Sequence, residues 1–315
     1  MMNIVLLLAF VKEMIGLYSM AAIGYVARKI NILDANANEV ITQLLLYITL
    51  PALILYSMNV PFSYSMGKEL LILFISSLYV LLSACVIARL MRKRSKIASQ
   101  RKNVFEALII FGNQGFIGYT ICYILFSEKG IIYATMFNFA YLLLIWSYGI
   151  YLFLRSTSSF PWKQVFFNPG ILSTIAGLLI FLLPIGFPQF VSDILNTIGK
   201  MTIPLSMILI GSLLKNIKVK DVFLLLKNVS IWQIAIVKLI ILPLILFPLT
   251  LLPLPFTLIG VAVLMSGMPC APTVSLYALK YGGDSYFASL AVFFTTLCTL
   301  VTIPILYLVL MNITI

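Results

Sequence analysis

The stretch SGMPCAPT, residues 266–273, interrupts a long apolar run near the end of the chain. Pro269 and Pro272 remove two backbone donors and free carbonyl groups in the preceding turn. A second interruption, FGNQGFIG at residues 111–118, combines three glycines with the amides of Asn113 and Gln114. Hydrocarbon tolerates unpaired backbone only where it is buried or lines a cavity. The two stretches therefore predict a pair of discontinuous helices that cross inside a membrane.

The amino-acid composition also indicates a membrane protein. Of 315 residues, 62% are hydrophobic and 10% are charged, whereas a soluble domain carries about 25% charged residues. The net charge of +12 does not indicate nucleic acid, because the basic residues lie in short breaks between apolar runs. The absence of histidine excludes histidine metal sites and histidine bases. We expect an all-α integral membrane protein without cofactor or metal that is not an enzyme.

A spanning helix needs about 20 mostly apolar residues, and the sequence contains ten such segments. The first run has no basic n-region or cleavage site, so we interpret it as a retained helix rather than a signal peptide. The predicted spans are residues 3–28, 37–58, 69–91, 103–126, 130–154, 168–188, 191–214, 221–250, 254–280 and 284–312.

The basic residues predict the orientation. The ends and loops that follow the odd-numbered spans hold sixteen of them, against Lys68 and Lys129 on the other side. The positive-inside rule then places both termini on the non-cytoplasmic face of the cell membrane. The sixteen are Arg28, Lys29, Arg89, Arg92, Lys93, Arg94, Lys96, Arg101, Lys102, Arg155, Lys163, Lys215, Lys218, Lys220, Lys227 and Lys280.

The chain also repeats itself. A shift of 153 residues superposes Gly24 on Gly177 and Thr49-Leu50-Pro51 on Thr202-Ile203-Pro204. Because five helices is an odd number, the second half would be inverted, as in many secondary transporters. We predict a first five-helix repeat at 1–154, a cytoplasmic linker at 155–167 and a second repeat at 168–315.

The crossing is the predicted binding site. Half-helix N-termini can face an anion there, while freed carbonyls can face a cation. The alternatives are a simple kink at the prolines and a close helix–helix contact at Gly115 and Gly118. The candidate substrate-binding residues at the crossing are Asn113, Gln114, Gly115, Gly118, Pro269, Cys270 and Pro272.

Charges within apolar runs supply further candidates, because they are costly in a membrane. Lys238 and Lys200 could attract a carboxylate; Lys200 could instead snorkel, and Lys238 could pair with Glu13. Glu13 is also the candidate for a coupling proton. Glu106 is expected at the interface, near the basic loop.

Five stretches resemble the auxin efflux carrier family: GNQGFIG, NPGILSTIAGLL, the segment at 202–214, MPCAPTVSLYALKYGGD and ASLAVFFTTLCTLVTIP. The resemblance implies a ten-helix, five-plus-five inverted fold similar to bile-acid symporters and sodium/proton antiporters, in which two domains move against each other. It also implies substrates such as malate, malonate or an auxin-like acid. Family members often carry a proline where this chain has Thr120, which argues against a hard break in that helix.

We therefore predict a secondary active or facilitative transporter of a small organic anion that works by alternating access. The alternatives are a sodium-coupled symporter of the bile-acid type, a channel and a non-transporting membrane sensor. No Walker-type loop is present to bind ATP phosphates. Coupling to H+ or Na+ and a homodimer are both left open by the sequence.

Overall fold

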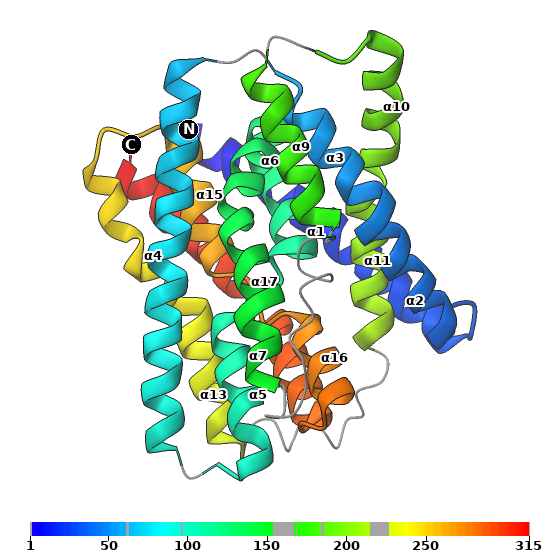
Figure 1. The fold of residues 1–315 in the computed structure, drawn as a ribbon, viewed down its shortest axis with the longest axis vertical. Coiled ribbons are helices and arrows are strands. Elements are labelled where there is room, and N and C mark those ends of the chain that lie inside the picture. Colours follow the sequence, from blue (N-terminus) through cyan, green and yellow to red (C-terminus); the bar gives the residue numbers. More distant parts are fainter. Residues whose placement is uncertain are drawn as a thin grey trace.

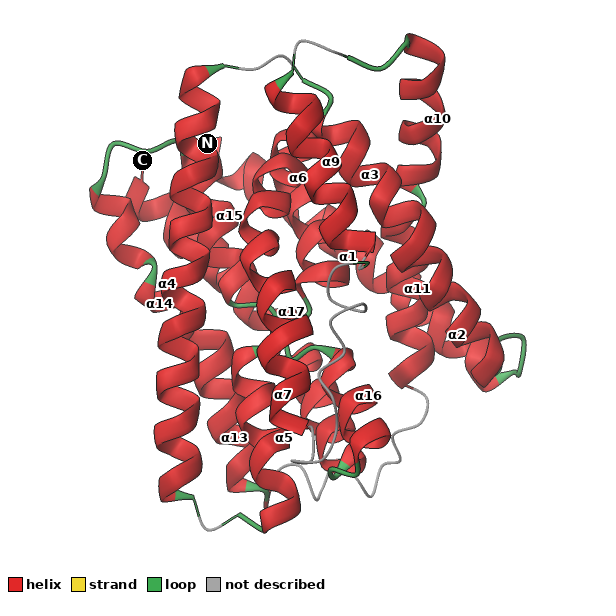
Figure 2. Ribbon diagram, in the orientation of Figure 1, coloured by secondary structure: helices red, strands yellow, loops and turns green. Residues whose placement is uncertain are grey.

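The computed structural model describes residues 2–60, 63–95, 97–153, 167, 169–183, 186–214 and 227–314, and these are helical almost throughout (Figures 1 and 2). The predicted linker at 155–167 lies outside the described residues except for Phe167. Among the described residues, the β-type pairing is one isolated bridge, between Gly112 and Cys270.

The described helices fall largely within the predicted spans, and those at 103–126 and 254–280 are interrupted. The first half contains α1 (Met2–Lys29), α2 (Ala35–Leu44), η1 (Leu45–Thr49), α3 (Leu50–Met58), α4 (Tyr64–Arg94), α5 (Ser99–Ile110), η2 (Gln114–Gly118), α6 (Tyr119–Leu144), η3 (Ile145–Gly149) and α7 (Ile150–Phe153). The second half contains α9 (Pro169–Leu182), α10 (Gln189–Lys200), α11 (Thr202–Leu214), α13 (Val229–Ile236), η4 (Val237–Ile241), α14 (Leu242–Ile245), η5 (Phe247–Leu251), α15 (Phe256–Ser266), α16 (Pro272–Tyr281) and α17 (Ser285–Thr314).

Local sequence explains where several helices begin and end. The Asp34 carboxylate accepts the Ala37 N–H at 2.6 Å, and the Ser63 hydroxyl accepts the Met66 N–H at 3.2 Å, so both cap a helix start. Helix α4 ends on Arg92, Lys93 and Arg94, whose charges complement the negative end of the helix dipole.

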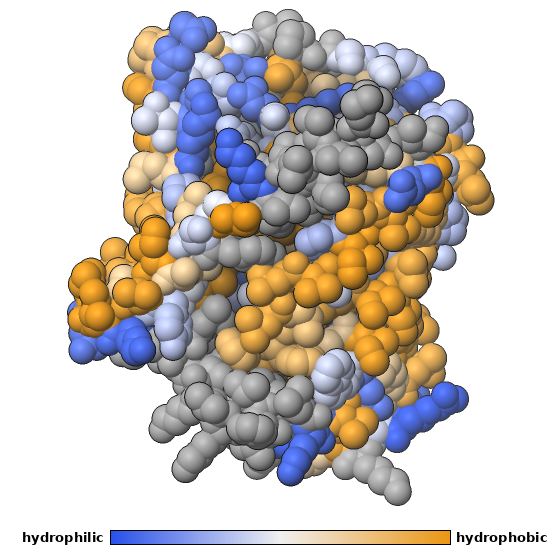
Figure 3. Space-filling view, turned by 180° about the vertical axis from the view of Figure 1, so that it is seen from behind, coloured by the Kyte–Doolittle hydropathy of each residue, from blue (hydrophilic) through white to orange (hydrophobic). Residues whose placement is uncertain are grey.

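Six described helical segments are long and apolar enough to cross a membrane: Asn36–Met58, Tyr64–Arg94, Gln114–Phe153, Gln189–Ser212, Val229–Leu251 and Ser285–Ile313. On the face in Figure 3, hydrophobic side chains cover much of the middle, and hydrophilic ones gather toward the two ends. The chain is therefore a multi-pass membrane protein.

The 40-residue segment Gln114–Phe153 consists of two helices joined at a kink. Ser127, within α6, has a non-helical backbone with φ 54° and ψ −143°. This change of direction separates the helical residues that precede Ser127 from those that follow it.

The helices pack as two groups. In the first, α1 packs along α11, and α3 packs against α9 and α10. In the second, α4 packs on α5 and α6, α15 on α6, and α17 on α5 and α16. The groups meet where α3 and α9 contact α6 and where α11 contacts η2. The interrupted helices both lie in the second group.

Candidate functional site

The two interrupted stretches meet and pair through their backbones. Helix α5 ends at Ile110, and the next helical turn starts at Gln114; α15 ends at Ser266, and α16 starts at Pro272. Between these ends, Asn113 N–H donates to Pro269 O at 2.6 Å, and Ala271 N–H donates to Phe111 O at 3.0 Å. The backbone groups that leave the helices are thus satisfied by each other, as burial in a membrane requires.

Two amide side chains secure the crossing. Asn113 is 4% exposed, and its Oδ1 accepts the Phe116 N–H at 3.3 Å, which caps the start of η2. Gln114 is 1% exposed, and its Nε2 donates to Met265 O at 3.3 Å, at the end of α15. The Gln114 Oε1 atom is buried and makes no hydrogen bond within the described part of the chain. It is therefore an acceptor that a ligand could use.

Lys238 places a positive charge at the crossing. It lies in η4 and is 1% exposed, and its Nζ donates to Ile110 O at 2.9 Å. Ile110 is the last residue of α5, so the ammonium faces the negative end of that helix. Among the described residues it forms no salt bridge with a carboxylate. Its hydrogen-bond partner is a carbonyl oxygen exposed by the break.

The glycines of the first stretch have different roles. A Cβ on Gly112 would lie 2.9 Å from Cε of Lys238 and 3.3 Å from Met268 O, so only glycine leaves room for the lysine. A Cβ on Gly118 would lie 2.7 Å from Sδ of Met265, which makes Gly118 a packing residue. A Cβ on Gly115 would meet no atom within 4 Å. The backbone of η2 therefore has an open side at Gly115.

Cys270 and Thr295 brace the second stretch. Cys270 N–H donates to Thr295 Oγ1 at 3.1 Å, and its Sγ donates to Leu108 O at 3.3 Å. Thr295 in turn donates to Ala291 O at 2.8 Å on α17. Sequence reasoning missed Thr295, although a threonine amid the apolar run of the last helix was the signal that could have revealed it.

The comparison with known proteins agrees with this architecture. The family model described as membrane transport protein matches the chain over residues 9–160 and 153–307. The chain belongs to this family. An uncharacterized transporter of Methanocaldococcus jannaschii is 26% identical over 199 residues, which cover 60% of this chain and 64% of that relative. The match therefore spans less than two thirds of the relative's length.

The predicted resemblance to auxin efflux carriers is thereby confirmed, and both the family and the relative are described as transporters rather than enzymes. The YGGD segment has a structural role. Gly282 ends α16 with φ 81°, a left-handed conformation that favours glycine. Asp284 accepts the Phe287 N–H at 2.8 Å and forms a 2.6 Å ion pair with Arg101 near the start of α5. The segment thus ties the two interrupted helices together at one end.

The structure does not bring every predicted residue to the crossing. Pro269, Cys270 and Pro272 lie there with the residues of the first stretch. Lys200 lies exposed at the end of α10, which packs on α3 and η1. Glu13 belongs to α1, and its side chain lies outside the described residues.

Glu106 lies in α5 and is buried beside the basic end of α4. Its side chain is fully buried and pairs with Arg92 at 2.6 Å, and it accepts the Tyr148 hydroxyl at 2.6 Å. The last turn of α4 supplies the arginine that makes this burial tolerable. Thr120 does not prevent the break either, because the interruption ends at Asn113 and Thr120 lies inside the helix that follows.

Proposed function

We propose that this transporter carries a small organic anion, such as a dicarboxylate or an auxin-like acid, and binds it at the crossing of its two interrupted helices. The observation that carries the proposal is the backbone pairing of Phe111 and Asn113 with Pro269 and Ala271. This pairing holds the start of η2 and the start of α16 near one point. Helix starts present free N–H groups and a partial positive charge, which suit a carboxylate.

The surroundings of the pairing also favour an anion. Lys238 is the buried cation beside it, and Gly115 provides an open approach to the η2 backbone. In the proposal, Asn113 and Gln114 orient the anion, Gly115 admits it, and Pro269, Cys270 and Pro272 shape the opposite wall. Lys200, exposed on α10, would attract the anion from solution rather than touch it at the crossing.

We further propose ten spans in two inverted repeats, 1–154 and 168–315. Two packing contacts support it: Gly24 abuts the backbone of Ile208 on α11, and Gly177 contacts Met58 and Ile54 on α3. Under the 153-residue shift, Gly24 corresponds to Gly177 and Ile208 corresponds to Leu55. The repeat therefore predicts a contact between Gly177 and Leu55, and the observed contact is with the adjacent residue Ile54.

Alternating access would arise from movement of the two packing groups. Side-chain bonds between them include Tyr56 of α3 to Glu128 of α6 at 3.0 Å and Thr120 of α6 to Ser206 of α11 at 3.3 Å. Both are polar contacts that can break and reform as helices slide. A cell-membrane location, a coupling proton at Glu13 and a homodimer remain predictions.

The proposed orientation places the termini outside and the basic loops in the cytoplasm. In Figure 1, N and C lie toward the upper end, while the connection from α4 to α5 lies at the bottom. That connection follows Arg92, Lys93 and Arg94, as the positive-inside rule expects of a cytoplasmic loop.

Substitutions at Gly115 test the binding site with the smallest expected effect on folding. Because a Cβ there meets no protein atom within 4 Å, Gly115→Ala should leave the protein folded. The larger Gly115→Leu should fill the space that the substrate needs and abolish uptake of carboxylates into proteoliposomes. Gly118→Leu is the contrasting variant, since it should lower the unfolding temperature by displacing Met265. Full uptake by folded Gly115→Leu would remove the crossing as the substrate site.

Sodium dependence separates the proposal from a bile-acid-type symporter. Lys238 already supplies a cation to the carbonyl end of α5, so no sodium ion is needed to balance it. We expect uptake to be unchanged when potassium or N-methylglucamine replaces sodium on both sides of the proteoliposome. Uptake that requires sodium would instead support the symporter.

A further inference from the structure

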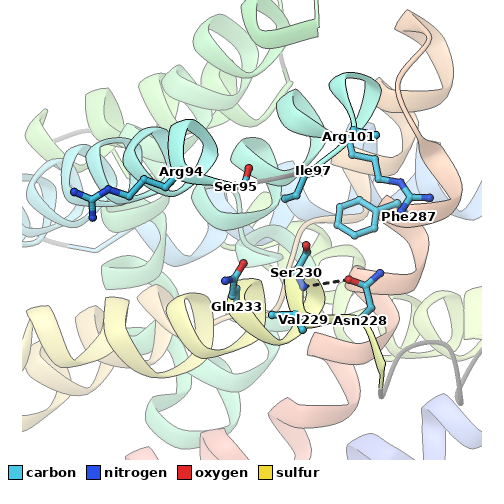
Figure 4. Close-up of a pocket in the computed structure, with 10 residues that line it drawn as sticks. Arg94, Ser95, Ile97, Arg101, Asn228, Val229, Ser230, Gln233 and Phe287 are labelled. Atoms are coloured by element: carbon cyan, nitrogen blue, oxygen red, sulfur yellow. Dashed lines mark hydrogen bonds between the residues drawn. The ribbon is translucent and has the colours of Figure 1, made fainter.

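A second site lies away from the crossing, at the end of the helices that carries the basic loop. A cavity of about 550 Å³ opens between the connection from α4 to α5, the start of α13 and Phe287 on α17 (Figure 4). Among the described residues, its lining includes Arg94 and Arg101 and no acidic side chain; Asp284, the partner of Arg101, lies outside the lining. None of the residues proposed to bind the transported anion lines it.

Arg101 lines this cavity, and two contacts hold its guanidinium in place. Its Nε donates to Asp284 at 2.6 Å, and its Cζ lies 5.3 Å from the centre of the Phe287 ring. These contacts fix the guanidinium plane. The Nη hydrogens form no hydrogen bond with the part of the chain that the structure describes. Arginine held in this way is suited to bidentate binding of a phosphate.

The opposite wall supplies neutral donors. Asn228 caps α13, with its Oδ1 accepting the Ser230 N–H at 3.1 Å, and its amide nitrogen makes no hydrogen bond within the part of the chain that the structure describes. Figure 4 shows Asn228, Ser230 and Gln233 along the start of α13, facing the connection that carries Ser95 and Ile97. The start of a helix adds partial positive charge to these donors. The cavity therefore combines a fixed guanidinium with hydroxyl and amide groups.

The position of the cavity favours a lipid headgroup as the source of a phosphate ligand. Val229 begins the apolar segment Val229–Leu251 and is 69% exposed, and Leu90, near the basic end of α4, is 50% exposed. Apolar side chains exposed beside a polar cavity at the end of a span lie where lipid headgroups meet acyl chains. Basic pockets at this level are suited to anionic lipid headgroups.

We propose that this cavity binds the phosphate of an anionic phospholipid headgroup, with Arg101 as its main ligand and Ser230 and Gln233 as further donors. The lipid would then connect the start of α5 with the start of α13. Binding to the folded state alone raises the unfolding temperature, and this gives a readout independent of transport.

The test uses the full chain purified in detergent, with thermal unfolding measured as lipid is added. Phosphatidylglycerol should raise the unfolding temperature, whereas phosphatidylcholine and inorganic phosphate should not. Arg101→Gln and Gln233→Leu should each lose most of that increase. Lys93→Gln should retain it, because Lys93 carries the same charge at the same end but does not line the cavity.

Each result decides the proposal. An equal response to phosphatidylcholine, or equal losses in Lys93→Gln and Arg101→Gln, would overturn it. If inorganic phosphate alone raises the unfolding temperature, the cavity binds a soluble anion, and the lipid proposal is also overturned. If Arg101→Gln does not fold after losing its pair with Asp284, the lipid response of Gln233→Leu decides.

Discussion

Replacing Gly24 by alanine is expected to lower the unfolding temperature of the purified transporter by roughly 5–10 °C. A Cβ on Gly24 would overlap the carbonyl oxygen of Ile208 and lie 2.8 Å from its Cα. These are backbone atoms of α11, so no side-chain rotation relieves the clash. The helices α1 and α11 would have to separate, at a cost of about 3 kcal/mol.

Gly16 provides the matched control within the same helix. A Cβ on Gly16 meets nothing within 4 Å, and alanine favours helix over glycine by about 1 kcal/mol. Gly16→Ala should therefore keep or slightly raise the unfolding temperature in the same assay. If the two variants unfold at the same temperature, α1 and α11 do not cross at Gly24, and the inverted repeat loses one of its two packing contacts.

The positions of the helices could be predicted from the sequence because the thickness of the membrane sets the length of each apolar run. A membrane of fixed thickness requires long apolar runs, and α4 and α17 follow their predicted spans within a few residues. The interruptions were predictable for a related reason. Glycine, proline and side-chain amides concentrated in a membrane segment favour a local end to the helix.

The contacts across the crossing could not be predicted in the same way. The register that sets Gly112 opposite Cys270 depends on how two distant helices approach each other. The partner found for Lys238 is a backbone carbonyl, and a carbonyl carries no sequence signal. Sequence reasoning considered only a substrate or an acidic side chain for this lysine. The burial of Glu106 was missed similarly, because its partner Tyr148 lies in another span.

Thr120 shows how one substitution can mislead a sequence argument. A proline at that position would suggest that the helix breaks nearby. Here the Thr120 hydroxyl donates to Phe116 O at 2.7 Å within the helix and contacts Ser206 of α11 at 3.3 Å. Gly112, which lies within the break, leaves room for the Lys238 side chain.

Replacing Lys238 by methionine is expected to reduce transport by roughly ten- to a hundredfold. Methionine keeps a four-atom apolar stem like that of lysine but lacks the terminal ammonium, so it cannot donate to Ile110 O. The variant therefore loses a hydrogen bond that holds the end of α5. A charge-assisted contact of the same lysine to the bound anion would be worth about 1.5–3 kcal/mol, and each 1.4 kcal/mol is about tenfold in affinity. The variant also loses the positive charge beside the pairing of the two interrupted helices, where we place the anion.

The measurement is the initial rate of carboxylate uptake into proteoliposomes, with the unfolding temperature measured on the same preparations. Lys200→Met is the comparison, because it removes an equal charge from an exposed position. We expect it to weaken apparent affinity slightly, and less at high salt, because exposed charges are screened. A folded Lys238→Met variant with normal uptake would contradict the role of this lysine in transport. A loss of folding without uptake of any anion would leave Lys238 as a structural residue that holds the end of α5.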